Sequence, residues 1–351
     1  EKSYSELSGI ELYWRDRQKF LETRGYMLRP RFCPGWVPSW TGTDKHPVLC
    51  DDSRELFVRR LSPIGNDSID ARIMATGQLV YIKKVGTGDD GSRLATILWE
   101  QPLRNDPANP CVPILDSFID NEDSSISYMV MPYLHCFDDP DQPEIVDDLV
   151  DLADQVLQVS VTMPPWVHIM MNVNACYPRD LFFRISSNQK AAPIPWFRRR
   201  AQIKYYFAYS SIAVHIPLEV EPKLAIPAFG GDIHVPEGRN QVPCDPFKTD
   251  IFMAGNLLRR EFRDRYSNVE FLLPLIKSMT QKNPALRPTA AEAFAQWQII
   301  RSRIPFLHRA WGMLRRHDNP IIKAMSEIYA FGLAVVHITT KAIDRVAGLQ
   351  G

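Results

Sequence analysis

Cysteine pairs are absent from this sequence. The six cysteines of the 351-residue chain form no C-x-x-C pair, and none has a histidine at zinc-finger spacing. The scatter excludes an ordinary zinc finger and a disulfide framework. We therefore expect free thiols in a reducing compartment and no bound metal.

A charge excess of either sign is also absent. The 41 lysines and arginines balance the 41 aspartates and glutamates, and the basic runs at 198–200 and 315–316 are too short to form a binding stripe. Nucleic-acid-binding domains usually carry a clear basic excess. The composition therefore predicts no nucleic-acid partner.

Long apolar runs are the third feature that the sequence lacks. The longest run, residues 328–338, is interrupted by His337 and falls short of the roughly 18 residues that a membrane-spanning helix needs. The opening residues are polar and contain no apolar signal core. We expect no membrane span and an intracellular protein, either cytoplasmic or nuclear.

What the sequence does contain is an order of strands first and helices later. β-rich segments lie at 78–85 and 126–134, and helical spacing follows at 145–157, 250–265, 269–280, 289–303 and 321–346. Thr289 and Glu292 have the spacing of a capping box at the start of one helix. This order predicts an α+β, two-lobed fold. The expected parts are a helix and Pro/Trp-rich strap (1–55), a strand-rich lobe (56–135), a helical lobe (136–305) and an amphipathic tail (306–351).

Three segments in this order resemble the protein kinase fold. Val80-Tyr81-Ile82-Lys83 is similar to the strand that carries the nucleotide lysine, and residues 128–134 are similar to the strand leading into the interlobe hinge. Residues 283–289 resemble the late segment in which an arginine precedes Pro-Thr. The chain resembles, more narrowly, a group of fungal protein-kinase-like proteins, through RGYMLRP (24–30), GWVPSW (35–40), DPANPCVPIL (106–115) and PCDPFKTD (243–250).

The resemblance implies a set of site residues. Lys83 would meet the phosphates of ATP, and Met131, Tyr133 and Leu134 would line the hinge. It also implies structural roles for three residues. Glu237 and Arg287 would form an ion pair, and Asp250 would anchor the catalytic-loop backbone.

The catalytic motifs of the family are degenerate here. Met163 stands where the catalytic base is expected, His168 replaces the metal-binding asparagine, and Tyr209 replaces the metal-binding aspartate. Phosphoryl transfer depends on these groups for positioning and charge neutralisation. The Arg-Asp-Leu around Asp180 imitates a catalytic loop but lies on the wrong side of the Ile-Met-Met landmark at 169–171, so Asp180 is only a weak candidate base.

The supporting parts are also missing. Arg93 occupies the position expected for the glutamate that orients Lys83, and Glu100 lies too near the helix end. Residues 62–77 hold only Gly65 and Gly77, too far apart for the glycine-rich loop that covers phosphates in kinases.

The sequence leaves three interpretations open. The chain is a pseudokinase that binds an unknown protein partner and binds ATP weakly or not at all, an active atypical kinase that uses Asp180, or a truncated or mis-spliced product of an active kinase gene. All three share the fold and the loss of the usual catalytic residues.

Overall fold

The structure, a computed structural model, describes residues 6–44, 46, 50, 52, 67–106, 109, 111–136, 144–160, 169–171, 203–207, 216, 219–226, 234–239 and 243–346. The chain divides into two compact units, residues 1–137 with 167–211, and residues 138–166 with 212–351. The first contains the strands and the second the later helices, so the fold is mixed α+β, as the sequence predicts.

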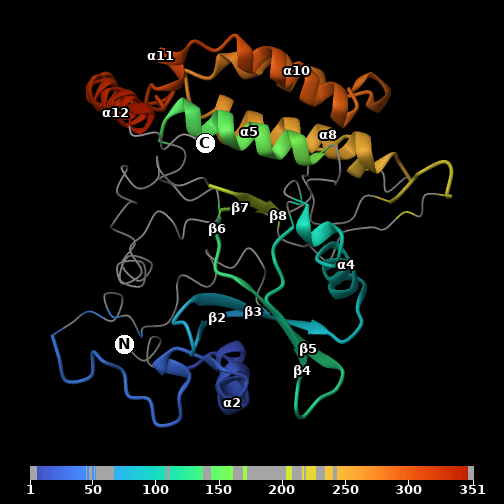
Figure 1. Cartoon of the computed structure of the whole chain (residues 1–351), viewed down its shortest axis with the longest axis vertical. Coiled ribbons are helices and arrows are strands. Elements are labelled where there is room, and N and C mark those ends of the chain that lie inside the picture. Colours follow the sequence, from blue (N-terminus) through green and yellow to red (C-terminus); the bar gives the residue numbers. More distant parts are fainter. Residues whose placement is uncertain are drawn as a thin grey trace. The chain divides into compact units, whose positions relative to one another are not determined.

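The first unit is built on a five-stranded antiparallel sheet (Figure 1) with the order β1-β2-β3-β5-β4. Isoleucine, valine and tyrosine dominate its central strands, because branched and aromatic side chains pack well on a pleated surface. The strands are β1 (Tyr26–Met27), β2 (Ser68–Ile73), β3 (Leu79–Gly86), β4 (Asp116–Ile119) and β5 (Ile126–Pro132).

Helix α2 (Gly9–Thr23) covers one face of this sheet. Trp14 and Leu21 are buried there in one core with Val80, Ile82 and Tyr128. A capping box at Ser8 starts the helix, and the sequence prediction of a helix ahead of the strap is confirmed.

The Pro/Trp-rich strap that follows α2 is anchored to that helix. It contains the short helix η1 (Pro30–Phe32). Arg31 is 2% exposed and donates to Glu11 Oε1 at 2.7 Å. The Trp36 and Trp40 rings meet edge to face at 6.0 Å, so the strap belongs to the packed body of the first unit.

The opposite face of the sheet carries helix α4 (Asp90–Leu98), followed by the turn η3 (Leu103–Asn105). A second, three-stranded antiparallel sheet follows the end of β5, with the order β6-β7-β8. Its strands are β6 (His135–Cys136), β7 (Ile169–Met171) and β8 (Tyr205–Phe207).

The second unit is helical. Trp297 is fully buried and donates from Nε1 to Asp154 Oδ1 at 2.6 Å, which fixes α10 against α5. Its elements are α5 (Val146–Ser160), η5 (Glu237–Arg239), α8 (Pro246–Leu257), the π-helical η6 (Leu258–Arg263), η7 (Glu270–Leu272), α9 (Leu273–Met279), η8 (Pro284–Leu286), α10 (Ala290–Ser302), α11 (Phe306–Arg309) and α12 (Pro320–Val346).

Local signals set several of these helix ends. The capping box predicted at α10 is confirmed, since the Glu292 N–H donates to Thr289 Oγ1 and the Thr289 N–H donates to Glu292 Oε2. Helix α8 begins four residues before the predicted start, because Asp245 caps it and Pro246 occupies its first turn.

The last helix bears on the expectation that the chain has no membrane span. Pro320–Ile343 of α12 is 24 residues long and, by length and composition, apolar enough to cross a membrane. The sequence argument counted uninterrupted apolar residues and so stopped at single polar positions. The relevant quantity is the hydropathy averaged over about 19 residues of the helix, and single polar positions lower this average only slightly.

Candidate functional site

Lys83 lies on the central strand of the five-stranded sheet. β3 has β2 on one side and β5 on the other, with Ser68 and Met129 as the cross-strand neighbours of Lys83. An edge-strand position for this lysine is therefore excluded. Because side chains alternate along a strand and Ile82 faces α2, Lys83 points to the opposite face, where α4 lies.

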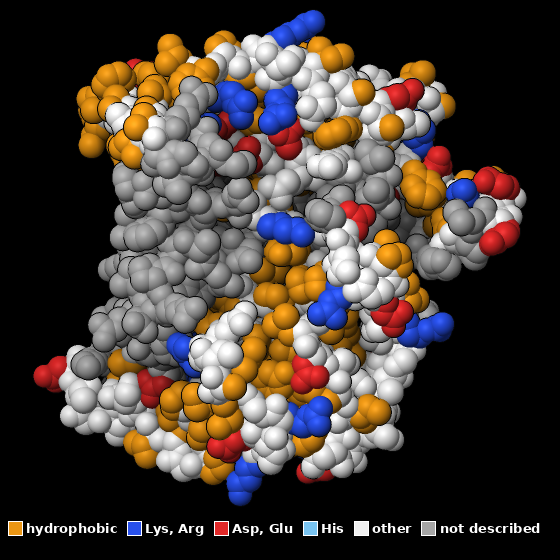
Figure 2. Space-filling view, in the orientation of Figure 1, with side chains coloured by type: hydrophobic (Ala, Val, Ile, Leu, Met, Phe, Trp, Pro, Cys, Tyr) orange, Lys and Arg blue, Asp and Glu red, His pale blue; other side chains and the backbone are white. Residues whose placement is uncertain are grey.

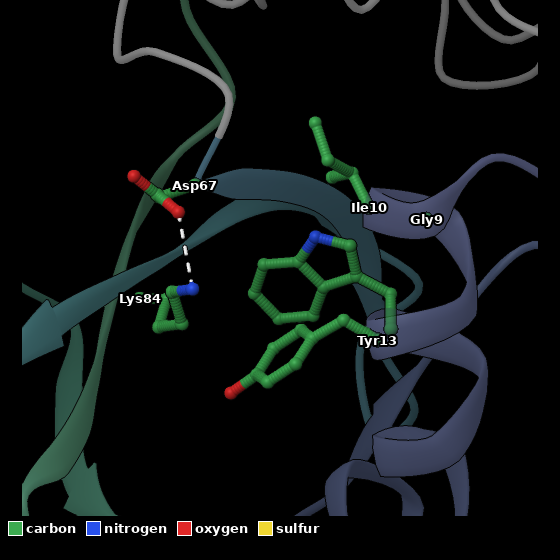
Figure 3. Close-up of a pocket in the computed structure, with 6 residues that line it drawn as sticks. Gly9, Ile10, Tyr13, Asp67 and Lys84 are labelled. Carbon is green, nitrogen blue, oxygen red and sulfur yellow. Dashed lines mark ion pairs between the residues drawn. The ribbon is translucent and has the colours of Figure 1, made fainter.

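Lys84, its neighbour, points to the α2 face and is already engaged there (Figure 3). Its ammonium lies 3.1 Å from Asp67 Oδ1 and 4.6 Å from the centre of the Tyr13 ring. These groups line a pocket of about 200 Å³ together with Gly9, Ile10 and Trp14. Of the two adjacent lysines, Lys83 is thus the one available to a ligand.

Lys83 is half-buried and makes no ion pair or hydrogen bond within the part of the chain that the structure describes. Burial lowers the pKa of its ammonium, and the nearby carboxylates of Asp89 and Asp67 oppose that shift. Arg93, which occupies the position expected for the orienting glutamate, is not among the described charges that act on Lys83.

Asp89 was missed by sequence reasoning, although it stands just before a helical segment, as capping residues do. Its carboxylate accepts from Ser92 N at 2.6 Å and from Gly86 N at 3.1 Å. Asp89 is therefore the N-cap of α4. Both carboxylate oxygens of Asp89 accept hydrogen bonds from backbone N–H groups. Asp89 therefore does not replace the glutamate that would orient Lys83.

The helix next to Lys83 offers no such glutamate either. Arg93 is exposed on α4, and Glu100 is exposed beyond its last turn. Both line a pocket of about 350 Å³, beside the hydroxyls of Ser117 and Ser127 and the side chain of Met129. This pocket borders the same face of the sheet as Lys83, because Met129 is the cross-strand neighbour of that lysine.

The three expected hinge residues Met131, Tyr133 and Leu134 are buried at the end of β5. The Tyr133 ring stacks on Tyr81 at 4.5 Å, with 20° between the ring planes. The Tyr133 N–H donates to the Leu79 carbonyl at 3.4 Å. The Tyr133 N–H, a backbone donor that an adenine ring would use at such a hinge, is thus already hydrogen-bonded within the protein.

Met163, His168, Asp180 and Tyr209 lie outside the described residues, as do most of their neighbours. The segments beside two of these positions are placed, however. β7, directly after His168, pairs with β8, two residues before Tyr209, with Ile169 opposite Phe207. Among the described residues, no group of three or more His, Cys, Asp or Glu side chains is arranged to hold a metal ion.

Glu237 and Arg287 meet in the second unit, as the sequence predicts. Arg287 Nη1 donates to Glu237 Oε1 at 2.6 Å, and Nη2 donates to Oε2 at 2.8 Å. The guanidinium also donates to the carbonyls of Gln281 and Lys248 and lies over the Phe252 ring. This bidentate pair ties η5 to the segment before α10.

Asp250 is buried in α8, but no hydrogen bond to either of its carboxylate oxygens is made by the described residues. Burial, with a smaller contribution from the charge of Asp245, raises its pKa to about 9. The resemblance assigns this residue to holding a catalytic-loop backbone, and no described backbone amide occupies that role.

Comparisons with known proteins add no family to this description. No family model matches the chain, and a search of curated proteins returned no match.

Proposed function

We propose that the chain is a two-lobed, protein-kinase-like binding module that does not transfer phosphate and binds ATP weakly or not at all. The observation that carries the proposal is Lys83. It keeps a central, half-buried place in an antiparallel sheet, yet it has no ion pair among the described residues. In an active kinase, a glutamate orients this lysine toward the phosphates.

The neighbouring strands support the kinase-like part of the proposal. β7 is the Ile-Met-Met segment at 169–171, and β8 ends two residues before Tyr209, which stands at the position of the metal-binding aspartate in the resemblance. They are far apart in the sequence but adjacent in one sheet, next to the strand that follows the hinge. A chance resemblance would not require these segments to pair.

The phosphate side of the site supports weak binding. Of residues 62–77, where the resemblance would place a glycine-rich loop, the structure describes 67–77, which form strand β2 and the start of a tight turn into β3. Backbone amides engaged in such a hairpin do not form a cradle for phosphates. The residues fit ATP with magnesium poorly, since no cluster of carboxylates that could hold the metal is found in the described part of the chain.

ATP at about 1 mM is expected to raise the melting temperature of the full chain by about 1 °C, with or without magnesium. A dissociation constant near the ligand concentration stabilises a protein by only about 0.4 kcal/mol. The measurement is a thermal-shift titration with ATP, with and without magnesium.

Lys83→Ala is the matched control, and it should abolish even the small shift. A rise of several degrees that requires magnesium would contradict the proposal, because it would demand metal ligands beyond those described. That result would favour the active, atypical kinase and make Asp180 the first residue to test.

A further inference from the structure

Two features of the structure lie outside the proposed function. One is the outward face of α12, where bulky apolar side chains gather, as the orange cluster over that helix in Figure 2 shows. Ile321 is 74% exposed there and Ile328 is 75% exposed, so no described residue covers this face. The other is the pocket on the α2 side of the first sheet (Figure 3), whose lining residues indicate the kind of ligand that fits.

Two aromatic rings form a corner of this pocket. The Tyr13 and Trp14 rings meet at 83° with their centres 5.3 Å apart, and both line the pocket together with Ile10. The Tyr13 and Tyr128 hydroxyls are hydrogen-bonded at 2.6 Å, and the Tyr128 hydroxyl donates to Asp120 Oδ2 at 2.6 Å. Because these hydrogen bonds fix the Tyr13 ring, the apolar wall of the pocket is already in place before a ligand enters.

Trp14 contributes a hydrogen-bond donor that lacks an acceptor. Its side chain is 2% exposed, and its Nε1–H donates to none of the described residues. A buried donor without an acceptor destabilises a fold. Bulk water does not reach this nitrogen, so the acceptor has to be a group that enters the pocket that Trp14 lines.

Lys84 contributes the one positive charge among the residues that line the pocket. Its ammonium has three N–H donors, and its printed ion pair is with Asp67 Oδ1 at 3.1 Å. The side chain of Asp67 is 61% exposed and that of Lys84 is 32% exposed, so the aspartate is the partner that can turn toward solvent. Exposed ion pairs contribute little to stability. A carboxylate brought by a ligand can therefore take the place of Asp67.

The first turn of α2 adds to the preference for a negative group. Gly9 and Ile10 line the pocket across from Lys84 (Figure 3), and the backbone N–H groups of these two residues have no acceptor among the described residues. The N-terminal end of a helix favours anions. Glu11, the acidic residue of this turn, already accepts from Arg31 Nε at 2.7 Å.

We infer that this pocket binds a small organic molecule with a single carboxylate, which accepts from Lys84 Nζ and Trp14 Nε1 while the apolar part packs against the Tyr13 ring. The volume of about 200 Å³ lies below the range of pockets for drug-sized ligands, so the ligand is small. One lysine balances one negative charge, and a doubly charged phosphate would be repelled more strongly by Asp67. Lys83 points to the other face of the sheet, so this site is separate from the ATP contacts discussed above.

Benzoate is a suitable probe, because it carries one carboxylate on a flat apolar ring. The indole N–H resonances of the ¹⁵N-labelled full chain are followed at neutral pH during a benzoate titration, and Trp14→Phe identifies the Trp14 resonance by its loss. Benzoate is expected to shift this resonance with a dissociation constant of about 1 mM. Benzamide, which has a similar shape and no charge, should bind at least about tenfold more weakly. Phenyl phosphate should bind no more tightly than benzoate.

Two variants change the charges of the site in opposite ways. Lys84→Met keeps the aliphatic stem and should weaken benzoate binding about tenfold or more, because the cation is lost. Asp67→Asn should tighten binding about threefold, because the carboxylate that competes for Lys84 is removed. The matched control is Lys19→Met, since Lys19 is exposed on α2 and does not line the pocket. The control should bind benzoate like the native chain, and all three variants should keep the native melting temperature.

The absence of a shift in the Trp14 resonance at about 10 mM benzoate overturns the proposal. Equal binding of benzoate and benzamide does so too, because the carboxylate would then play no part. Tighter binding of phenyl phosphate contradicts the choice of a singly charged ligand. Binding that neither Lys84→Met nor Asp67→Asn changes would place benzoate outside this pocket.

Discussion

Replacing Arg287 with alanine is expected to lower the free energy of unfolding by about 3–5 kcal/mol. The Arg287 side chain is completely buried, and its partner Glu237 is only 10% exposed. Removing the guanidinium leaves a buried carboxylate without a counter-charge. It also leaves the carbonyls of Gln281 and Lys248 without their donor.

Urea unfolding followed by tryptophan fluorescence measures this loss, because Trp297 is fully buried in the same unit. The control is Arg265→Ala, which breaks an ion pair of similar length with Glu261 at a position where the arginine is 56% exposed. Exposed pairs contribute less than about 1 kcal/mol. Equal losses in the two variants would show that the Glu237–Arg287 pair does not hold the unit together.

Replacing Asp250 with asparagine is expected to stabilise the chain at neutral and alkaline pH. The unfolded aspartate has a pKa of about 3.9, whereas the folded pKa is raised to about 9. Below about pH 4, the carboxyl is protonated in both states and its contribution is fully present. As pH rises toward 9, the unfolded state ionises first, and stability is lost across that window.

Asparagine does not titrate, so this loss disappears in the variant. The difference in unfolding free energy between variant and native chain should be small at pH 4 and should grow to on the order of 5 kcal/mol near pH 8. Urea unfolding of both chains across this range measures it, and comparing the two cancels every other titrating group. A constant difference would mean that the Asp250 carboxylate is ionised and has a partner in the folded chain.

Much of the fold follows from local signals in the sequence. β-rich residues around Lys83 predicted a strand, and the Thr289–Glu292 spacing predicted a helix start, because both depend on neighbours a few positions away. Helix interruptions were harder to predict. Pro274 lies at the start of α9 and η7 precedes it, although helical spacing across 269–280 indicated one continuous helix.

The parts of the site that sequence reasoning missed depend on contacts between distant segments. Stacking of Tyr81 on Tyr133 follows from strand register, which apolar spacing alone does not fix. The two roles of Lys83 and Lys84 follow from which face α2 covers. The exposed face of α12 could not be recognised either, since an amphipathic pattern does not say which side packs on the protein.

The central claim is that the chain does not transfer phosphate, and an assay of labelled-phosphate transfer tests it most directly. The purified full chain is incubated with labelled ATP, magnesium and a generic protein substrate, beside Lys83→Ala and Tyr209→Asp variants. The account predicts no transfer above the Lys83→Ala background, and none from Tyr209→Asp, because a single restored metal ligand leaves Met163 and His168 unchanged and residues that act as a unit are not additive. Transfer by the native chain that Lys83→Ala abolishes would contradict the account.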